Sequence, residues 1–429
     1  MTQTGFPNRT EIEQHQLSSL RALIAELIPS NKFYAARLEA ASVSDRISSL
    51  SAFQKAMPFT SKLEIVEDQA AHPPYGTNLT YPLERYTRFN QTSGTSGGPL
   101  RWLDTTESWT WMVGNWVEVL QASGVGSRDH IFFAFSFGPF LGFWTAFEAG
   151  VRLGCLCIPG GGMSSAARVR SILDNDVTVV CCTPTYAIRL GEVARDDGLP
   201  LAESRVRKIM VAGEPGAGIP ATRARIESLW GRAQVCDHHG MTEIGPVTFE
   251  CPDRRGTLHV IEKAFIPEVI DPETGLPVGP GETGELVLTN LGRVGSPLLR
   301  YRTGDLVRRS KVERCACGRF DMALEGGILG RTDDMVIIRG VNVYSTSIEQ
   351  IVRGFDQVAE YRVQVSTARA LPEITVHIEP SPICADTETL ARGVEGALRN
   401  AFNLRVPVAL APCGSLPRFE HKAKRWIWE

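Results

Sequence analysis

The stretch Val177-Thr-Val-Val-Cys-Cys182 is a short uncharged run, mostly apolar, and it indicates a buried β-strand. Similar runs recur from about residue 130 onward, at Ile131–Phe135, Cys155–Ile158, Ile209–Ala212 and Ala233–Cys236. Segments of helical length separate them, such as Ser165–Leu173 and Thr222–Trp230. Buried strands that alternate with helices predict an α/β fold with doubly wound, mostly parallel sheets, in which ligands bind at the carboxyl ends of the strands.

The segments on either side of this region have a different pattern. Thr10 and Glu13 have the spacing of a capping box, which predicts an N-terminal helix that stops at Pro29. Glycine- and proline-rich turns with short strands predict a β-rich subdomain over about residues 246–330. We therefore expect a large N-terminal domain of residues 1–332 and a small α+β C-terminal domain of residues 333–429.

The composition limits the class of protein. The chain has 429 residues, a formal net charge of −3, 43% hydrophobic residues and 22% charged residues, which is typical of a globular protein. A nearly neutral charge argues against binding to nucleic acid or to an anionic membrane. The sequence shows no apolar signal core and no run of ~20 apolar residues, so we expect a cytoplasmic location.

A loop rich in glycine and hydroxyl residues, Gln91-Thr-Ser-Gly-Thr-Ser-Gly-Gly-Pro99, is the densest candidate for binding chemistry. Such a loop can present backbone N–H groups and hydroxyls to phosphate oxygens. It is not a Walker loop, because no Gly-Lys-Ser/Thr follows at the required spacing. A flexible linker is the alternative interpretation.

A second candidate, Asp237-His-His-Gly-Met-Thr-Glu243, directly follows a predicted strand. Glu243 can bind Mg²⁺, which prefers one or two carboxylates together with phosphate oxygens. Thr242 can donate to a phosphate, and an imidazole can stack on a base. The alternative is a turn with two incidental histidines.

Three further motifs, Tyr301-Arg-Thr-Gly-Asp305, Gly330-Arg-Thr-Asp-Asp334 and the lysine Lys422 near the C-terminal end, are each common when taken singly. Together with the two loops above, their order and spacing resemble the adenylate-forming acyl-CoA synthetase superfamily. Within it, the chain resembles the phenylacetate-CoA ligase branch, including aryl-CoA ligases of the anthranilate and benzoate type. The resemblance covers about residues 55–429.

The resemblance implies an ATP-dependent ligase that activates an aromatic carboxylic acid as an acyl adenylate and transfers it to CoA, with Mg²⁺ as a cofactor. Lys422 would be catalytic together with Thr242, and Glu243 would bind Mg²⁺. Asp333 would be the hinge of a mobile C-terminal domain, and Gly340 would line the CoA tunnel. The ATP-binding residues would be Thr92, Ser93, Gly94, Thr95, Ser96, Gly97, Gly213, Glu214, Pro215, Asp237, His238, His239, Gly240, Met241, Thr242, Asp305 and Arg331.

Three positions depart from the pattern of the superfamily. Leu100 stands where many members have lysine, although the phenylacetate branch often lacks it. His239 replaces a usual tyrosine, which keeps an aromatic face and adds a titratable group. His421 precedes Lys422 where glycine is usual, and this leaves Lys424 as a second candidate for the catalytic lysine.

The acyl pocket should lie along Phe135–Phe143, which relatives use to surround the aromatic ring. An aromatic wall favours a flat aryl acid through offset stacking and burial. We expect Phe137 and Phe140 to line the pocket together with Gly213 and Gly240. Phe132 and Phe133 are expected in the core.

A separate set of metal-ligating residue types comprises Cys251, His259, Cys315 and Cys317. Three thiolates and an imidazole make a closed tetrahedral Zn²⁺ site with no position left for water, which makes it structural rather than catalytic. Cys-x-Cys alone is a weak signal. Some relatives in the phenylacetate branch carry the same arrangement, and the resemblance therefore implies a structural zinc.

Two other functions stay open at this point. One is an adenylating enzyme that passes the aryl group to a carrier protein or an amine. The other is a non-catalytic nucleotide-binding protein, against which the retained Lys422, Glu243 and Asp305 argue. A homodimer is common among similar ligases.

Overall fold

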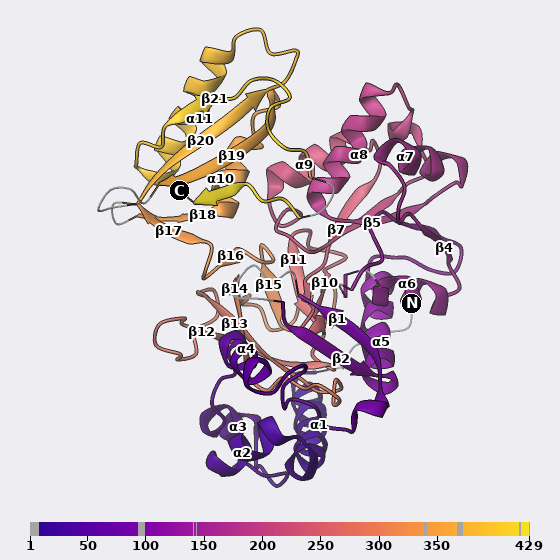
Figure 1. Cartoon of the computed structure of the whole chain (residues 1–429), viewed down its shortest axis with the longest axis vertical. Coiled ribbons are helices and arrows are strands. Elements are labelled where there is room, and N and C mark those ends of the chain that lie inside the picture. Colours follow the sequence, from indigo (N-terminus) through magenta and orange to yellow (C-terminus); the bar gives the residue numbers. More distant parts are fainter. Residues whose placement is uncertain are drawn as a thin grey trace. The chain divides into compact units, whose positions relative to one another are not determined.

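The computed structural model describes residues 8–92, 99–139, 141–142, 144–338, 341–366, 372–419 and 422–428, without the side chains of Ile337 and Asn342. The chain divides into two compact units (Figure 1). Unit 1 comprises Met1–Gly161 and Asp237–Ile328, and unit 2 comprises Gly162–Cys236 and Leu329–Glu429. The C-terminal region thus belongs to the same compact unit as residues 162–236. The predicted boundary between two domains at Asp333 stays a prediction.

Unit 1 begins with helices, the first three of which contribute to an apolar core around Leu20 and Tyr34 that also contains Ile266. These helices are α1 (Arg9–Ser30), α2 (Lys32–Ala40), α3 (Leu50–Ala56) and α4 (Lys62–Ala71). The predicted cap of α1 is wrong by two residues, because the side chain of Asn8 accepts the capping hydrogen bond from the backbone of Glu11 at 3.0 Å. Pro29 lies inside the last turn of α1 rather than stopping it.

An α/β portion of unit 1 follows. It comprises β1 (Tyr86–Gln91), β2 (Arg101–Thr105), α5 (Thr106–Ala122), β3 (His130–Phe133), α6 (Trp144–Arg152) and β4 (Leu156–Pro159). Strands β1 and β2 pair in antiparallel fashion and carry the glycine-rich loop between them. Strands β3 and β4 pair in parallel, as the βαβ pattern of the sequence predicts.

The rest of unit 1 is rich in antiparallel strands. The short hairpin β8 (Gly240–Met241) and β9 (Gly245–Pro246) comes first. One sheet has the order β10 (Thr248–Glu250), β11 (Thr257–Val260) and β15 (Ala323–Glu325). Another contains β12 (Phe265–Ile270), β13 (Thr283–Asn290) and β14 (Tyr301–Arg308).

Unit 2 combines two portions of the chain. The first comprises α7 (Ser165–Asp174), β5 (Val179–Cys182), α8 (Pro184–Asp196), β6 (Lys208–Val211), α9 (Pro220–Leu229) and β7 (Gln234–Asp237), whose last residue belongs to unit 1. Strands β5 and β6 are parallel, which confirms the alternating pattern that Val177–Cys182 opens.

The second portion of unit 2 is an α+β layer with its own core. It comprises β16 (Gly330–Arg331), β17 (Met335–Ile338), β18 (Val341–Tyr344), α10 (Ser345–Val352), β19 (Val358–Ser366), β20 (Glu373–Pro380), α11 (Thr387–Phe402), β21 (Val408–Leu410) and β22 (Trp426–Trp428). Its main sheet has the order β21-β20-β19-β22, and α11 lies beside it (Figure 1).

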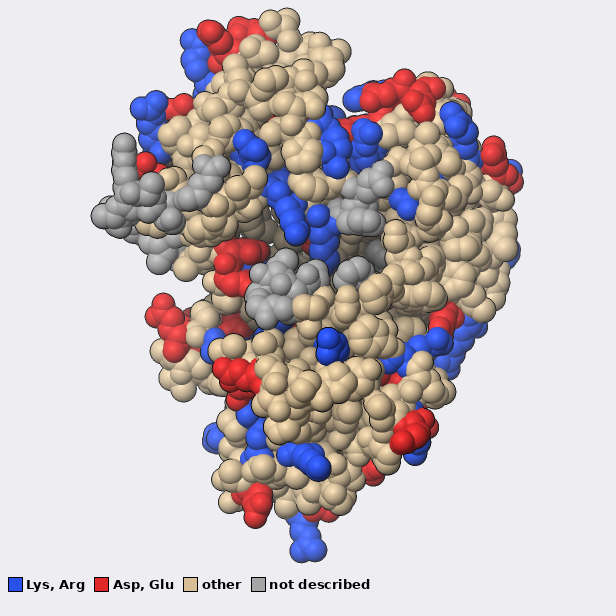
Figure 2. All heavy atoms as spheres, in the orientation of Figure 1, with Lys and Arg blue, Asp and Glu red and all other residues tan. Residues whose placement is uncertain are grey.

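The visible face of unit 1 agrees with the nearly neutral composition. On the face shown in Figure 2, basic and acidic side chains lie interspersed over unit 1 rather than in one continuous basic patch. No helix among the described residues is long and apolar enough to cross a membrane.

Candidate active site

The loop that follows β7 is held in place by strand β10. The carboxylate of Glu250 accepts a hydrogen bond from the backbone N–H of Asp237 at 2.7 Å. The hydroxyl of Thr248 accepts from the backbone N–H of His239 at 2.9 Å. Sequence reasoning missed Thr248 and Glu250, because residues that act on a loop through its backbone belong to no motif.

His238 is a core residue. Its Nδ1 lies 2.6 Å from the carbonyl oxygen of Thr248, and its ring packs on Trp116 with centroids 4.2 Å apart. Burial lowers the pKa of His238 to about 3, so the ring is neutral and donates Nδ1–H to that carbonyl. The side chain of His238 is thus engaged in the core, and the nucleotide contact predicted for this residue stays a prediction.

We expect His238 to make the protein less stable in mild acid. The unfolded histidine takes up a proton below about pH 6.5, whereas the folded one stays neutral until about pH 3, so stability falls as the pH drops between these values. Between pH 7 and pH 5 the loss from this residue is about 2 kcal/mol. Urea unfolding of His238→Asn at both pH values should show a smaller pH dependence by that amount. The exposed His72→Asn serves as the control, and equal slopes in wild type and His238→Asn would contradict the assignment.

Two of the residues predicted to contact base and ribose, His239 and Asp305, lie together in unit 1. The Nε2 of His239 is 3.2 Å from the Oδ2 of Asp305, and both side chains are almost completely buried. Asp305 lies on β14, where its backbone N–H donates to the hydroxyl of Thr303 at 3.0 Å. The structure thus brings together one residue from the loop after β7 and one from the Tyr301–Asp305 motif.

The hairpin β8–β9 needs glycine at Gly240. A Cβ at this position would lie 2.8 Å from the carbonyl oxygen of Gly245, and Gly245 itself has a φ of +95°. Met241, the other residue of β8, is half-buried. The turn that carries Thr242 and Glu243 is therefore tightly closed.

A buried ion pair supports this turn. The guanidinium of Arg293 donates to the carbonyl oxygen of Thr242 at 2.7 Å. The same guanidinium makes two hydrogen bonds of 2.6 Å to the carboxylate of Asp104, and neither side chain is exposed to solvent. Bidentate geometry of this kind fixes the orientation of the arginine, so the pair defines the position of the Thr242 carbonyl. No sequence motif contains either residue.

Glu243 is a buried carboxylate at the end of the turn. Its Oε1 lies 3.4 Å from the Nζ of Lys62 at the start of α4, and its side chain is 7% exposed. The carboxylate therefore lies beside a cation in an environment that is nearly closed to solvent. It offers the hard oxygen ligand that Mg²⁺ prefers.

The glycine-rich loop is closed at its base. The backbone N–H of Thr92 donates to the carbonyl of Leu100 at 2.9 Å, and the hydroxyl of Thr92 accepts from the N–H of Leu100 at 3.0 Å. Thr92 is buried, and its two hydrogen bonds hold the end of β1 next to the start of β2. Ser93, Gly94, Thr95, Ser96 and Gly97 lie outside the described residues.

An aromatic cluster lies beyond β3. The half-buried ring of Phe137 lies 4.6 Å from both Phe135 and Trp144 between centroids, and 5.5 Å from Phe147. Phe132 and Phe133 are fully buried, as expected of core residues. Phe140 lies outside the described residues.

In unit 2, Lys422 lies against Gly213. A Cβ on Gly213 would be 3.4 Å from the Cε of Lys422, and the φ of +96° at Gly213 favours glycine. The carboxylate of Glu214 bonds to backbone N–H groups of the protein, and Pro215 is half-buried.

The predicted ribose ligand Arg331 and the predicted hinge Asp333 form an ion pair, with Nε to Oδ1 at 2.7 Å. Both residues belong to unit 2. The roles predicted for them stay predictions, and Gly340 lies outside the described residues.

The four predicted zinc ligands converge in unit 1. The ligand atoms of Cys251, His259, Cys315 and Cys317 all lie within 4.8 Å of one another. Among the pairs, Cys251 Sγ lies 3.5 Å from Cys315 Sγ, and Cys317 Sγ lies 3.4 Å from His259 Nε2. These separations suit ligands that each lie about 2.0–2.3 Å from one tetrahedral Zn²⁺.

His259 is in the form that a metal needs. Its Nδ1 is 3.1 Å from the carbonyl oxygen of Asp321, which fixes the proton on Nδ1 and leaves the lone pair of Nε2 facing the three cysteines. Burial lowers the pKa of His259 to about 4, so the ring is neutral near pH 7. The donor set and the tautomer fit zinc.

Comparison with known proteins agrees with these features. Residues 14–292 match the family of AMP-binding enzymes, and residues 340–428 match the AMP-binding enzyme C-terminal domain. A phenylacetate-coenzyme A ligase of Thermus thermophilus is 31% identical over 95% of this chain and 94% of its own length. A solved 2-hydroxyisobutyryl-CoA ligase in its postadenylation state, bound to an acyl adenylate, has a TM-score of 0.92 at 27% identity over 98% of this chain and 90% of that one.

The same ligase in its thioesterification state has a TM-score of 0.73 at 28% identity, over 98% of this chain and 90% of that one. The family match covers well over half of the chain and includes the loops that hold Asp237–Glu243 and Thr92. The chain therefore belongs to the AMP-binding, adenylate-forming enzymes, in their phenylacetate-CoA ligase branch, and is an ATP-dependent, AMP-forming acid–CoA ligase.

Proposed function

We propose that the acid is aromatic, a benzoate, an aminobenzoate or a phenylacetate. The observation that carries this proposal is the cluster of Phe135, Phe137, Trp144 and Phe147, whose rings meet edge-on or tilted around the half-buried Phe137. Flat rings pack well on such a wall through offset and edge-to-face contacts. The similarity to phenylacetate-coenzyme A ligases supports the same class.

A small branched aliphatic acid is the second candidate. It is favoured by the high TM-score to a ligase that carries a 2-hydroxyisobutyryl adenylate. Such an acid would leave part of an aromatic pocket unfilled and would lose the stacking energy of a ring, which is about 0.5–1.5 kcal/mol for each aromatic pair.

The chemistry proceeds in two steps. A carboxylate oxygen of the acid attacks the α-phosphorus of ATP, and the bond to the bridging oxygen of pyrophosphate breaks. The thiol sulfur of CoA then attacks the acyl carbon, AMP leaves with the electron pair of the C–O bond, and the thiol proton passes to solvent. Free carboxylates are poor electrophiles, so the adenylate supplies the leaving group that the thioester step requires.

We assign the charge-neutralising roles in the first step to residues on the loops described above. The loop that begins at Thr92 would hold the β- and γ-phosphates, and Thr242 would donate to the α-phosphate. Glu243 would hold Mg²⁺, which neutralises phosphate charge. Lys422 would bridge the acyl carboxylate and the α-phosphate, where its cation stabilises the transition state.

Of the residues that we assign to the nucleoside, His239 is held in place by Thr248 through its backbone. His239 would face the base. Asp305 would accept hydrogen bonds from both hydroxyls of the ribose, and Arg331 would donate to the ribose. Gly213, Glu214 and Pro215 would border the base through their backbone. Asp333 would act as the hinge between the two steps, with Gly340 beside the thiol.

A structural Zn²⁺ is a further part of the proposal. Cys251, His259, Cys315 and Cys317 would hold it and so join the end of β10 to the turn before β15. The separations of the ligand atoms and the tautomer of His259 support this assignment.

A panel of acids tests the proposed substrate class. Formation of AMP from ATP should be measured with CoA and benzoate, 2-aminobenzoate, phenylacetate or 2-hydroxyisobutyrate, as kcat/KM for each acid. We expect kcat/KM for the best aryl acid to exceed that for 2-hydroxyisobutyrate by at least about 10-fold. The smaller acid loses a ring contact of about 1 kcal/mol, and it also buries less apolar surface because it has fewer carbons. A higher kcat/KM for 2-hydroxyisobutyrate than for every aryl acid would overturn the aromatic assignment.

A further inference from the structure

Both carboxylate oxygens of Glu214 are bound to backbone donors from distant parts of unit 2. Oε1 accepts from the N–H of Thr185, in the first turn of α8, at 2.9 Å. Oε2 accepts from the N–H of Ala423, the residue that follows Lys422, at 2.7 Å. Glu214 therefore links a helix of the first portion of unit 2 to the segment that carries the lysine.

A carboxylate is suited to this bridge because it only accepts hydrogen bonds and offers two oxygens. Bonds from an N–H to an ionised carboxylate are about twice as strong as neutral ones. The position near the start of α8 adds a favourable interaction with the positive end of the helix dipole. An amide in the same place would direct its NH₂ group at one of the two N–H donors.

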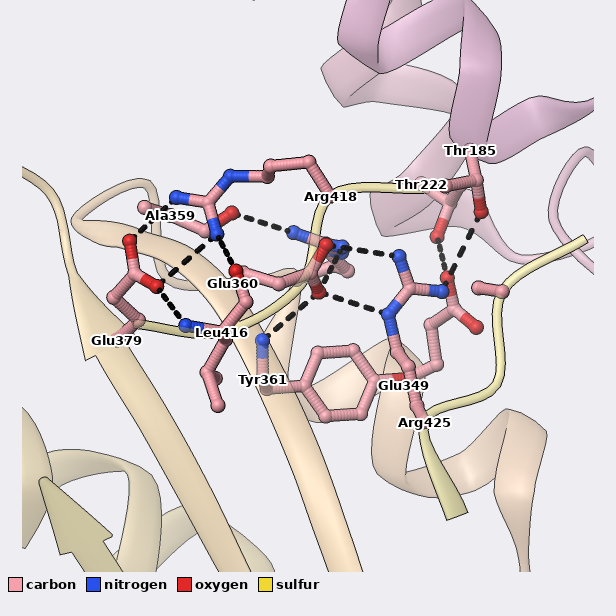
Figure 3. Close-up of polar contacts among 12 residues, drawn as sticks. Thr185, Thr222, Glu349, Ala359, Glu360, Tyr361, Glu379, Leu416, Arg418 and Arg425 are labelled. Carbon is pink, nitrogen blue, oxygen red and sulfur yellow. Dashed lines mark hydrogen bonds and ion pairs between the residues drawn. The ribbon is translucent and has the colours of Figure 1, made fainter. Parts of the chain in front are cut away.

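The lysine segment has two further contacts with the same region. The aliphatic stem of Lys422 lies against Gly213, directly before Glu214 in the chain. The guanidinium of Arg425 donates to the hydroxyl of Thr185 at 3.4 Å while it pairs with Glu360 at 2.8 Å, and Figure 3 shows Arg425 between these two partners. Residues 422–425 are thus fixed on both sides of Ala423.

We propose that Glu214 is a positioning residue for Lys422 in the adenylation step. Its carboxylate fixes the backbone next to the lysine to α8, which leaves the side-chain torsions of Lys422 as the main freedom of its ammonium group. This inference rests on the proposed role of Lys422. It also implies that the bond to Ala423 breaks when the C-terminal portion moves for the thioester step, so that Glu214 matters for adenylation and not for thioester formation.

Glu214→Gln tests the proposal with almost no change in shape. We expect acid-dependent ATP–pyrophosphate exchange to fall about 10- to 100-fold in kcat, since displacement of a catalytic group by about 1 Å can cost a factor of this size. Thioester formation from a supplied acyl adenylate should change less than about twofold. Gln350→Ala is the matched control, because Gln350 joins the same two portions of unit 2 through the N–H of Ala221 at 3.1 Å but is not next to Lys422.

A double mutant distinguishes an effect of Glu214 that acts through Lys422 from a general effect on the enzyme. If Glu214 acts through the lysine, Glu214→Gln added to Lys422→Ala should not slow adenylation further. A further drop of the full 10-fold or more would contradict the role, as would an equal loss in Gln350→Ala.

Hydrogen exchange gives a readout that needs no activity. Glu214→Gln should speed exchange of the backbone amides in a peptide that covers residues 422–428, and unchanged exchange would show that the bond to Ala423 is absent in solution. If the wild-type protein shows no acid-dependent exchange of pyrophosphate into ATP, the proposed function fails. The hydrogen-exchange measurement still decides in that case whether Glu214 holds the segment.

Discussion

Replacement of Lys422 by alanine is expected to slow adenylation by about 10²–10³-fold, which is the typical cost of losing one positioned group that stabilises transition-state charge. The structure supports the choice of this lysine, because its Cε lies close to Gly213. Acid-dependent exchange of pyrophosphate into ATP measures the step. Thioester formation from a supplied acyl adenylate should stay within about twofold of wild type, since the α-phosphate is then already substituted.

Lys424→Ala is the matched control for this prediction. Lys424 is exposed and lies two residues further along the same segment. Its substitution removes the same ammonium group and leaves the same methyl group. We expect its adenylation rate to stay near that of wild type. A larger loss in Lys424→Ala than in Lys422→Ala would transfer the role to Lys424, and equal loss of both half-reactions in Lys422→Ala would refute a role confined to adenylation.

Loss of the zinc ligands should have the largest effect on stability. In Cys315→Ser we expect the zinc content to fall from about one ion per chain to nearly none. We also expect the free energy of unfolding to fall by several kcal/mol, on the order of 3 or more, because a structural zinc contributes its binding energy to folding. Metal analysis of protein purified without an affinity tag and urea unfolding measure the two effects. The exposed Cys413→Ser should change neither.

The same substitution should raise the KM for ATP. Cys251 directly follows Glu250, whose carboxylate holds the backbone of Asp237 at 2.7 Å and that of Gly256 at 2.6 Å. A loosened end of β10 would therefore release the loop that carries His239. Wild-type protein without zinc, or Cys315→Ser with unchanged stability and zinc content, would contradict the site.

The alternating apolar runs predicted the parallel strands well. Val177–Cys182 contains β5, and Thr222–Trp230 overlaps α9 except for two residues at its start. Periodicity works here because buried parallel strands are apolar on both faces. The cap of α1 was missed for a local reason: Glu13 pairs with Arg9 at 3.1 Å instead of returning to the backbone at Thr10.

The site was predictable only where its chemistry lies in contiguous motifs. The sequence pointed to His239, Asp305 and the four zinc ligands, and the structure brings each of these sets together. It could not indicate the contact between Arg293 and Asp104, which are 189 residues apart. Glu214 shows the same limit, because a motif reveals that a carboxylate is present but not which backbone amides it accepts.

The most direct test of the ligase assignment is the dependence of product formation on CoA. With an aryl acid, ATP and Mg²⁺, wild-type protein should exchange pyrophosphate without CoA, and addition of CoA should yield one acyl-CoA for each AMP released. Release of AMP that CoA does not accelerate, with no acyl-CoA formed, would contradict the account and indicate transfer to a carrier protein or an amine.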